Sequence, residues 1–167
     1  EMGTAEVEVS IVRRPRSEWT QEGPSTVELM YRPAAGLSAR PLRKIASGGE
    51  VSRVMLACKV VLGKADGIET LVFDEVDAGV GGSTALALAQ VLARLAATHQ
   101  VIVVTHLAQV AVVGGCHYLV LKSGGKLPET TLRRIDGEAR VREVARMLSG
   151  DESDVSIAHA RQMLADA

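Results

Sequence analysis

An apolar run ends abruptly in two acids at residues 71–75, Leu-Val-Phe-Asp-Glu. Such a run is typical of a buried strand in a parallel sheet, and α/β folds bind ligands at the carboxyl ends of these strands. The first acid, Asp74, can hold Mg²⁺, usually through water, and Glu75 can polarise a water for attack on a phosphate. This is a Walker B pattern extended by a catalytic glutamate, although strands ending in Asp-Glu are also common without that role.

The elements after these acids place a further polar group beside them. Residues 83–98 are predicted to form an Ala/Leu-rich helix and residues 101–104 a second short strand, so this part is predicted as a βαβ unit in a sheet covered on both faces. His106 follows the second strand, at the same edge as Glu75. An imidazole there can hydrogen-bond a γ-phosphate or the attacking water, although a histidine at a strand end is more often structural. The other histidines are expected to be ordinary surface or boundary residues: His99, His117 and His159.

A polar loop stands in front of the first long helix, which apolar residues at helical spacing predict over residues 50–62. The loop reads Ser47-Gly48-Gly49-Glu50. Its two glycines let backbone N–H groups approach an anion, and the helix N-terminus adds partial positive charge. Ser47 and Glu50 also fit a capping box, which needs no ligand. Capping does not explain Gly48 and Gly49, because a plain cap favours better helix formers.

The rest of the chain is predicted to flank this unit with further strands and helices. Residues 5–12 and 26–31 alternate apolar and polar side chains, as half-buried strands do, so the first third is predicted to be antiparallel β structure with loops. We expect two units, a β segment with its loop at 1–44 and a lobe at 45–167. Within the lobe we also expect a helical turn at 107–113, strands at 117–122 and 130–135, and helices at 138–148 and 154–165.

Composition and charge narrow the class of protein. The 167 residues hold 19 Lys and Arg against 20 Asp and Glu, a net charge of −1, and 47% are hydrophobic, as in a soluble globular domain. No apolar segment approaches the ~20 residues of a membrane span. Cys58 and Cys116 lie far apart without a CxxC pair, which favours a reducing, cytoplasmic setting. The arginines at 133–146 alternate with acids, so we expect a solvated ion-pair face there rather than a DNA surface.

In chain order, these motifs resemble the C-terminal half of an ABC-type ATPase head. Residues 47–50 stand in the place of the signature loop, and Asp74 and Glu75 in that of Walker B with its catalytic glutamate. The D-loop follows at 76–79, and His106 stands in the place of the switch histidine. The motifs further resemble the RecN family of bacterial DNA repair proteins, which are SMC-like ATPases. The resemblance runs from about Val27 to Leu164 and is carried by residues 45–53, 73–82, 104–111, 145–151 and 158–161.

The resemblance implies an α/β fold, the C-terminal half of an ABC/SMC-type ATPase head with a parallel βαβ core and an N-terminal antiparallel β segment. It implies ATP and Mg²⁺ as cofactors, with Asp74 supporting the metal, Glu75 acting as general base and His106 sensing the γ-phosphate. Two heads would dimerise around ATP, with Asp77 bridging their interface. The signature loop would bind the nucleotide of the other head through Ser47, Gly48, Gly49 and Glu50.

One motif of such a head is missing, because no G-x-x-x-x-G-K-[ST] occurs in the chain. We therefore expect a fragment or separately expressed lobe, without Walker A lobe or coiled coil, that is inactive alone. Its expected partners are a Walker A-containing N-terminal lobe, a second head, and DNA through the full-length protein, with no membrane, in the cytoplasm and associated with the nucleoid. We also expect the signature loop and the Walker B acids to lie at opposite ends of the lobe, each completing a different nucleotide pocket.

Two other functions are compatible with parts of the pattern. A non-catalytic assembly lobe would carry a vestigial site, but the retained Glu75 and His106 argue against it. The nucleotide-binding half of an ABC transporter more typically has Gln where Glu50 stands, and the tail at 145–161 does not favour it.

Overall fold

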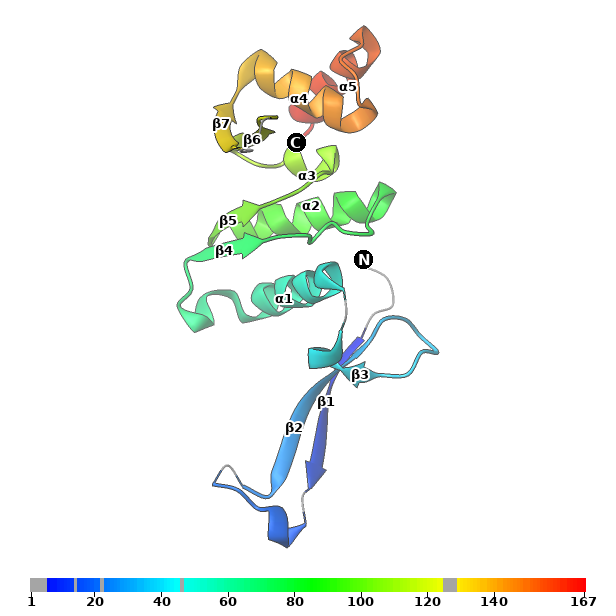
Figure 1. The fold of residues 1–167 in the computed structure, drawn as a ribbon, viewed down its shortest axis with the longest axis vertical. Helices are drawn as coiled ribbons and strands as arrows, with labels where there is room; N and C mark the ends of the chain where they lie inside the picture. Colours follow the sequence, from blue (N-terminus) through cyan, green and yellow to red (C-terminus); the bar gives the residue numbers. More distant parts are fainter. Residues whose placement is uncertain (1–5, 14, 22, 46, 125–128) are drawn as a thin grey trace.

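The computed structural model describes residues 6–13, 15–21, 23–45, 47–124 and 129–167. In these ranges the strands form three small sheets, with helices between and beside them (Figure 1). Two predicted segments each contain a residue outside the described ranges, Ala5 in the first strand and Ala46 in the signature region.

The predicted βαβ unit is present at the centre of the chain. Strand β4 (Thr70–Phe73) leads through helix α2 (Gly82–Ala96) to strand β5 (Gln100–Val103), and the two strands pair in parallel. α2 covers one face, where Leu71 and Phe73 of β4 join its buried leucines in the main core. The expectation that both faces are covered is wrong. Val72 and its register partner Ile102 are 65% and 46% exposed, because the described residues place no layer over that face.

Helix α1 (Gly48–Leu62) precedes this unit and is followed by the 3-10 turn η3 (Gly63–Asp66). Gly63 ends α1 with a φ of 55°, a backbone conformation that favours glycine. Leu56 is completely buried and joins the main core. Several of the apolar residues that predicted this helix are nevertheless exposed: Val51, Met55, Val61 and Leu62.

An antiparallel ribbon forms the first part of the chain, as predicted. It consists of β1 (Glu6–Arg13), the turn η1 (Arg16–Glu18), β2 (Ser25–Arg32), the short β3 (Arg40–Pro41) and the turn η2 (Leu42–Lys44). The expectation of half-buried strands is wrong for most of its length. Ile11 and Val27 are register partners on one face, and both are more than 60% exposed, because the ribbon extends away from the helices (Figure 1). Among the ribbon residues whose burial is described, Tyr31 near one end is the buried one.

The last part of the chain packs around a second core. Helix α3 (Ala108–Ala111) leads into the antiparallel hairpin of β6 (His117–Lys122) and β7 (Thr130–Ile135), followed by α4 (Gly137–Ser149) and α5 (Asp154–Ala165). These bounds match the predicted elements closely. The second core consists of small and β-branched side chains of three helices and the residue after α3: Ala108, Val112, Val141, Val144, Ala145 and Ala160.

The arginine-rich region of this last part has one ion pair of the expected kind, although its acid, Glu143, is buried rather than solvated. Arg146 forms two hydrogen bonds with Glu143, at 2.6 and 2.8 Å, and the hydrogen bond and the charge of that carboxylate raise the pKa of Arg146. Arg140 donates instead to the carbonyls of Val112 and Gly114 at the end of α3. Among the described residues, no helix has both the length and the apolar character needed to cross a bilayer.

Candidate functional site

The predicted acids and the predicted histidine follow neighbouring strand ends. β4 and β5 are paired in register up to Phe73 and Val103, and the Val104 N–H continues the pairing by donating to the Phe73 carbonyl at 2.9 Å. Asp74 and Glu75 follow the first strand and His106 the second, so all three lie at the carboxyl edge of the sheet. The side chains of both acids are exposed, which leaves them accessible to a ligand.

The chain makes a compact turn directly after β4, and residues 74–80 are called the D-loop turn below. Two hydrogen bonds close it, from the Ala78 N–H to the Glu75 carbonyl at 2.9 Å and from the Val80 N–H to the Asp77 carbonyl at 3.1 Å. Glu75 has a φ of 56° and is the one non-glycine residue with positive φ in the described part of the chain. Such a conformation costs on the order of 1–3 kcal/mol and is typical of functional sites.

The Asp77 side chain connects the D-loop turn to the segment after β5. Its Oδ2 accepts hydrogen bonds from the Thr105 hydroxyl and, at 3.1 Å, from the His106 backbone N–H. The same oxygen lies 3.2 Å from Nδ1 of His106, whose side chain is 70% exposed. Asp77 itself is only 1% exposed. Its carboxylate therefore interacts within the lobe, and its role at a dimer interface stays a prediction.

Helix α1 holds the D-loop turn from the other side. The Ser52 hydroxyl donates to the Asp74 carbonyl at 2.8 Å, and Arg53 donates to the Ala78 carbonyl at 2.8 Å. The sequence predicts no role for Ser52, Arg53 or Thr105. Their only signal is their position inside the motif segments, because a serine or arginine in a helix otherwise looks like a solvent-facing residue.

The signature loop lies against the D-loop turn, so the expectation that the two lie at opposite ends of the lobe is wrong. A Cβ on Gly48 would fall 2.5 Å from Glu75 Oε2. The physical reason is the short connection from α1 to β4. A helix that turns back into a strand packed beside it runs antiparallel to that strand, so its start returns to the strand's carboxyl end.

The packing of the D-loop turn also explains Gly49, one of the two glycines that capping left unexplained. A Cβ on Gly49 would fall 2.9 Å from both the Glu75 carbonyl oxygen and the Ala78 Cβ. Glycine is therefore needed for close packing of the turn, independently of any ligand. The cap itself is present, because Ser47 Oγ accepts from the Glu50 N–H at 3.4 Å.

The donor set at this edge fits Mg²⁺ only together with a nucleotide. Among the described residues, no group of three or more His, Cys, Asp or Glu side chains could hold a metal ion. Asp74 offers one exposed carboxylate, and Mg²⁺ in nucleotide sites is commonly bound by one or two carboxylates plus phosphate oxygens and water.

Proteins of known family match the chain closely. It is 51% identical over 140 residues to the DNA repair protein RecN of Treponema pallidum, covering 83% of this chain and 24% of that protein. It is 45% identical over 167 residues to RecN of Deinococcus radiodurans, covering 99% of this chain and 29% of that protein. This chain belongs to the RecN family of DNA repair proteins. It spans about a quarter of the length of these relatives, and no family model matches it.

The fold of this RecN-like lobe has a solved counterpart. The crystal structure of an Smc head domain with a coiled coil and joint from Pyrococcus yayanosii covers 96% of the lobe, and the lobe covers 26% of that chain. The TM-score is 0.55 at 15% identity, a likeness of fold alone. The expected α/β architecture of an SMC-type head is thereby confirmed.

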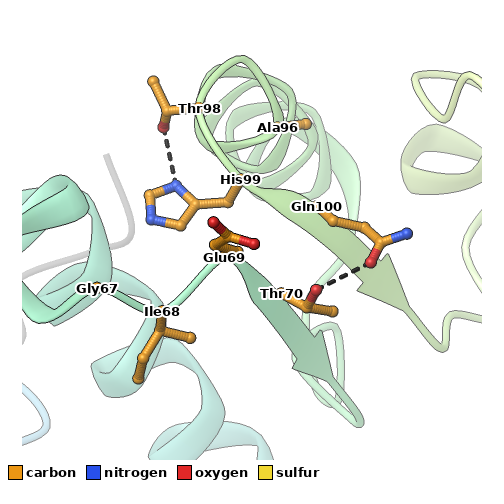
Figure 2. Close-up of a pocket in the computed structure, with 8 residues that line it drawn as sticks. All are labelled: Gly67, Ile68, Glu69, Thr70, Ala96, Thr98, His99 and Gln100. Carbon is orange, nitrogen blue, oxygen red and sulfur yellow. Dashed lines mark hydrogen bonds between the residues drawn. The ribbon is translucent and has the colours of Figure 1, made fainter.

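A cavity of about 560 Å³ lies at the opposite, amino end of the strands in the RecN-like lobe (Figure 2). Glu69, Thr70 and His99 line it. His99 was expected at the surface or a boundary, but it is only 6% exposed, which corrects that expectation. Its Nδ1 lies 2.8 Å from the Thr98 hydroxyl, and its buried Nε2 has no hydrogen-bond partner among the described residues. The cavity is not part of the candidate site, since Asp74 and Glu75 lie at the other end of β4.

Proposed function

We propose that this lobe hydrolyses ATP in DNA double-strand-break repair once a Walker A-containing N-terminal lobe completes the head. The observation that carries the proposal is the in-register parallel pair β4–β5, whose neighbouring carboxyl ends are followed by Asp74, Glu75 and His106. The RecN relatives are named as DNA repair proteins, which supports the biological setting. The proposal includes DNA contact through the complete protein and a cytoplasmic, nucleoid-associated location.

Each side chain at the carboxyl edge has one task in this proposal. Asp74 holds Mg²⁺, whose charge neutralises phosphate oxygens. Glu75 takes the proton of the attacking water as general base. His106 hydrogen-bonds the γ-phosphate through its exposed ring nitrogen.

The signature loop binds the nucleotide of a second head in the proposed ATP-dependent dimer. Ser47, Gly48, Gly49 and Glu50 begin α1, so the backbone N–H groups of its first turn are the donors offered to phosphate. The Glu75 carboxylate lies against Gly48, so this contact must open before a phosphate reaches the loop. The proposed dimer surface then runs along the carboxyl edge of the sheet. The signature loop and the Walker B acids both belong to this surface, rather than to pockets at opposite ends of the lobe.

Uncovered apolar side chains support a partner lobe within the same head. Val72, Ile102 and Val104 are exposed on and beside the free face of the β4–β5 sheet, and Ile11 and Val27 are exposed on the ribbon. Exposed apolar side chains that lie next to one another, as Val72 and Ile102 do on the sheet, mark an interaction site. We propose that the Walker A lobe covers it.

The test is to assemble the head from this chain and the Walker A lobe of the same protein. We expect negligible ATP turnover by the chain alone, turnover by the assembled head, and faster sedimentation of the assembled head when ATP is added. Turnover by the chain alone would contradict the need for a partner. An assembled head with neither turnover nor ATP-dependent sedimentation would overturn the proposed activity and favour an assembly lobe.

A further inference from the structure

The burial of Asp77 within the D-loop turn is unusual for an acid. Its side chain is 2% exposed, while Asp74 and Glu75 in the same turn are exposed. A carboxylate is almost never fully buried unless it is paired and hydrogen-bonded. The Asp77 carboxylate contacts Thr105 and His106, which both belong to the segment after β5.

The charge of this carboxylate, which lies beside the His106 ring, favours one position for the ring proton. An ionised carboxylate only accepts hydrogen bonds, so a nitrogen 3.2 Å from Asp77 Oδ2 is stabilised there when it carries a proton. Nδ1 of His106 is that nitrogen. A bare Nδ1 would set its lone pair against the carboxylate, which is repulsive. The favoured neutral form of His106 therefore has Nδ1–H, and Nε2 is its other ring nitrogen.

The same oxygen also restricts the ring position. Oδ2 accepts the His106 backbone N–H at 3.1 Å, so one atom contacts both the main chain and the side chain of that residue. Thr105 donates its hydroxyl to the carboxylate and accepts the Leu107 N–H at 3.0 Å, which holds the backbone on the other side of His106. Two contacts to one residue limit its χ1 rotation more than one contact does.

We propose that Asp77 is a positioning residue that fixes the tautomer and ring orientation of His106 and thereby couples the D-loop turn to the switch histidine. The inference rests on the proposed function, because it assumes that Nε2 of His106 meets the γ-phosphate. A movement of the turn that carries Glu75 would then also move the imidazole. The proposed base, Glu75, and the proposed γ-phosphate ligand, His106, would then reach their working positions together.

The test uses nitrogen-15 NMR of the histidine rings in the head assembled with the Walker A lobe, at a pH where the imidazoles are neutral. The His106→Gln variant identifies the His106 signals. We expect a protonated-type shift at Nδ1 and a bare-type shift at Nε2, whereas an unconstrained neutral imidazole prefers the opposite tautomer. Asp77→Asn should shift His106 toward that opposite form. Thr105→Val is the matched control, because it removes a hydrogen bond from the same carboxylate and should leave the tautomer unchanged.

Kinetics add a second measurement on the same variants. Asp77→Asn should lower kcat by about 10- to 100-fold, the range for residues that orient a functional group, with little change in KM for ATP. A wild-type spectrum with the proton on Nε2, or an unchanged tautomer in Asp77→Asn, would overturn the proposal. The wild-type spectrum suffices if the variant does not fold. Because the spectrum needs no turnover, it tests the positioning role even in a head that does not hydrolyse ATP.

Discussion

Strand β5 has a histidine near each end, and the structure holds the two in opposite ways. His106 follows the strand with its ring exposed and its Nδ1 against the buried carboxylate of Asp77. His99 precedes the strand with its ring buried against a cavity, while the neighbouring carboxylate of Glu69 is exposed (Figure 2). At the carboxyl end the carboxylate is buried and the imidazole is exposed, whereas at the amino end the imidazole is buried and the carboxylate is exposed. A histidine is suited to meet a ligand when its orienting partner is buried and its own ring is exposed.

The largest expected effect separates the two ends through their glutamates. In the assembled head, Glu75→Gln should slow ATP turnover on the order of 10²–10⁴-fold, because it removes the general base, and should lengthen the lifetime of the ATP-bound dimer. Glu69→Gln is the matched control at the amino end and should leave turnover unchanged. Steady-state turnover and sedimentation measure both effects. Equal turnover in the two variants would contradict the proposal that hydrolysis takes place at the carboxyl end of the strands.

A second variant tests the packing of the carboxyl end. Gly49→Ala should lower the free energy of unfolding by about 1–3 kcal/mol, since its Cβ would meet the Glu75 carbonyl and the Ala78 Cβ at 2.9 Å. Gly115→Ala is the control, because a Cβ there meets no atom within 4 Å. Denaturant titration compares the two. Equal midpoints would show that α1 and the D-loop turn are not in close contact.

Substitution of His99 should mainly lower the stability of the protein, whereas substitution of His106 should mainly lower ATP turnover. His99→Ala should cost about 1 kcal/mol of stability by removing a buried ring, and turnover should persist. His106→Asn should change stability by less than about 0.5 kcal/mol, since its ring is mostly exposed, and should reduce turnover. Thermal melts and turnover assays on both variants test this. The comparison fails if His99→Ala is the variant that loses turnover.

The smallest expected effect concerns a third kind of carboxylate, exposed but hydrogen-bonded. Asp151, between α4 and α5, accepts from the hydroxyls of Ser156, Ser149 and Ser153 and from the Ser153 N–H, and these bonds lower its pKa from 3.8 to about 2. The unfolded chain binds the proton more readily, so the stabilisation is present above about pH 4 and is lost as the pH falls toward 2. In Asp151→Asn, stability should depend less on pH in that window. An NMR titration that gives an ordinary pKa for Asp151 would contradict this.

Much of the fold could be predicted because its local signals agree with each other. The helix at α2, the β-branched run at β5 and the acids after Phe73 all indicate one βαβ unit, and the bounds of β6, β7 and α5 match the prediction. What covers each face could not be predicted. Alternation at Ile11 and Val27 indicates a strand, but burial depends on a neighbouring layer, and the described residues place none over the ribbon.

The candidate site was predictable in its residue types and not in its contacts. Asp74, Glu75 and His106 lie at one edge because parallel strands bring their ends together. The burial of Asp77 and the contact of Gly48 with Glu75 depend on how α1 folds back on β4. The spacing of residues in the sequence does not predict how α1 packs against β4.

The left-handed backbone of Glu75 has a practical consequence for protein engineering. Glycine, or asparagine to a lesser degree, adopts this conformation more readily than glutamate. A library selected for heat resistance alone would therefore enrich such replacements at position 75 and discard the very acid on which hydrolysis is proposed to depend. Selection for thermostability in this lobe has to be coupled to a screen for turnover.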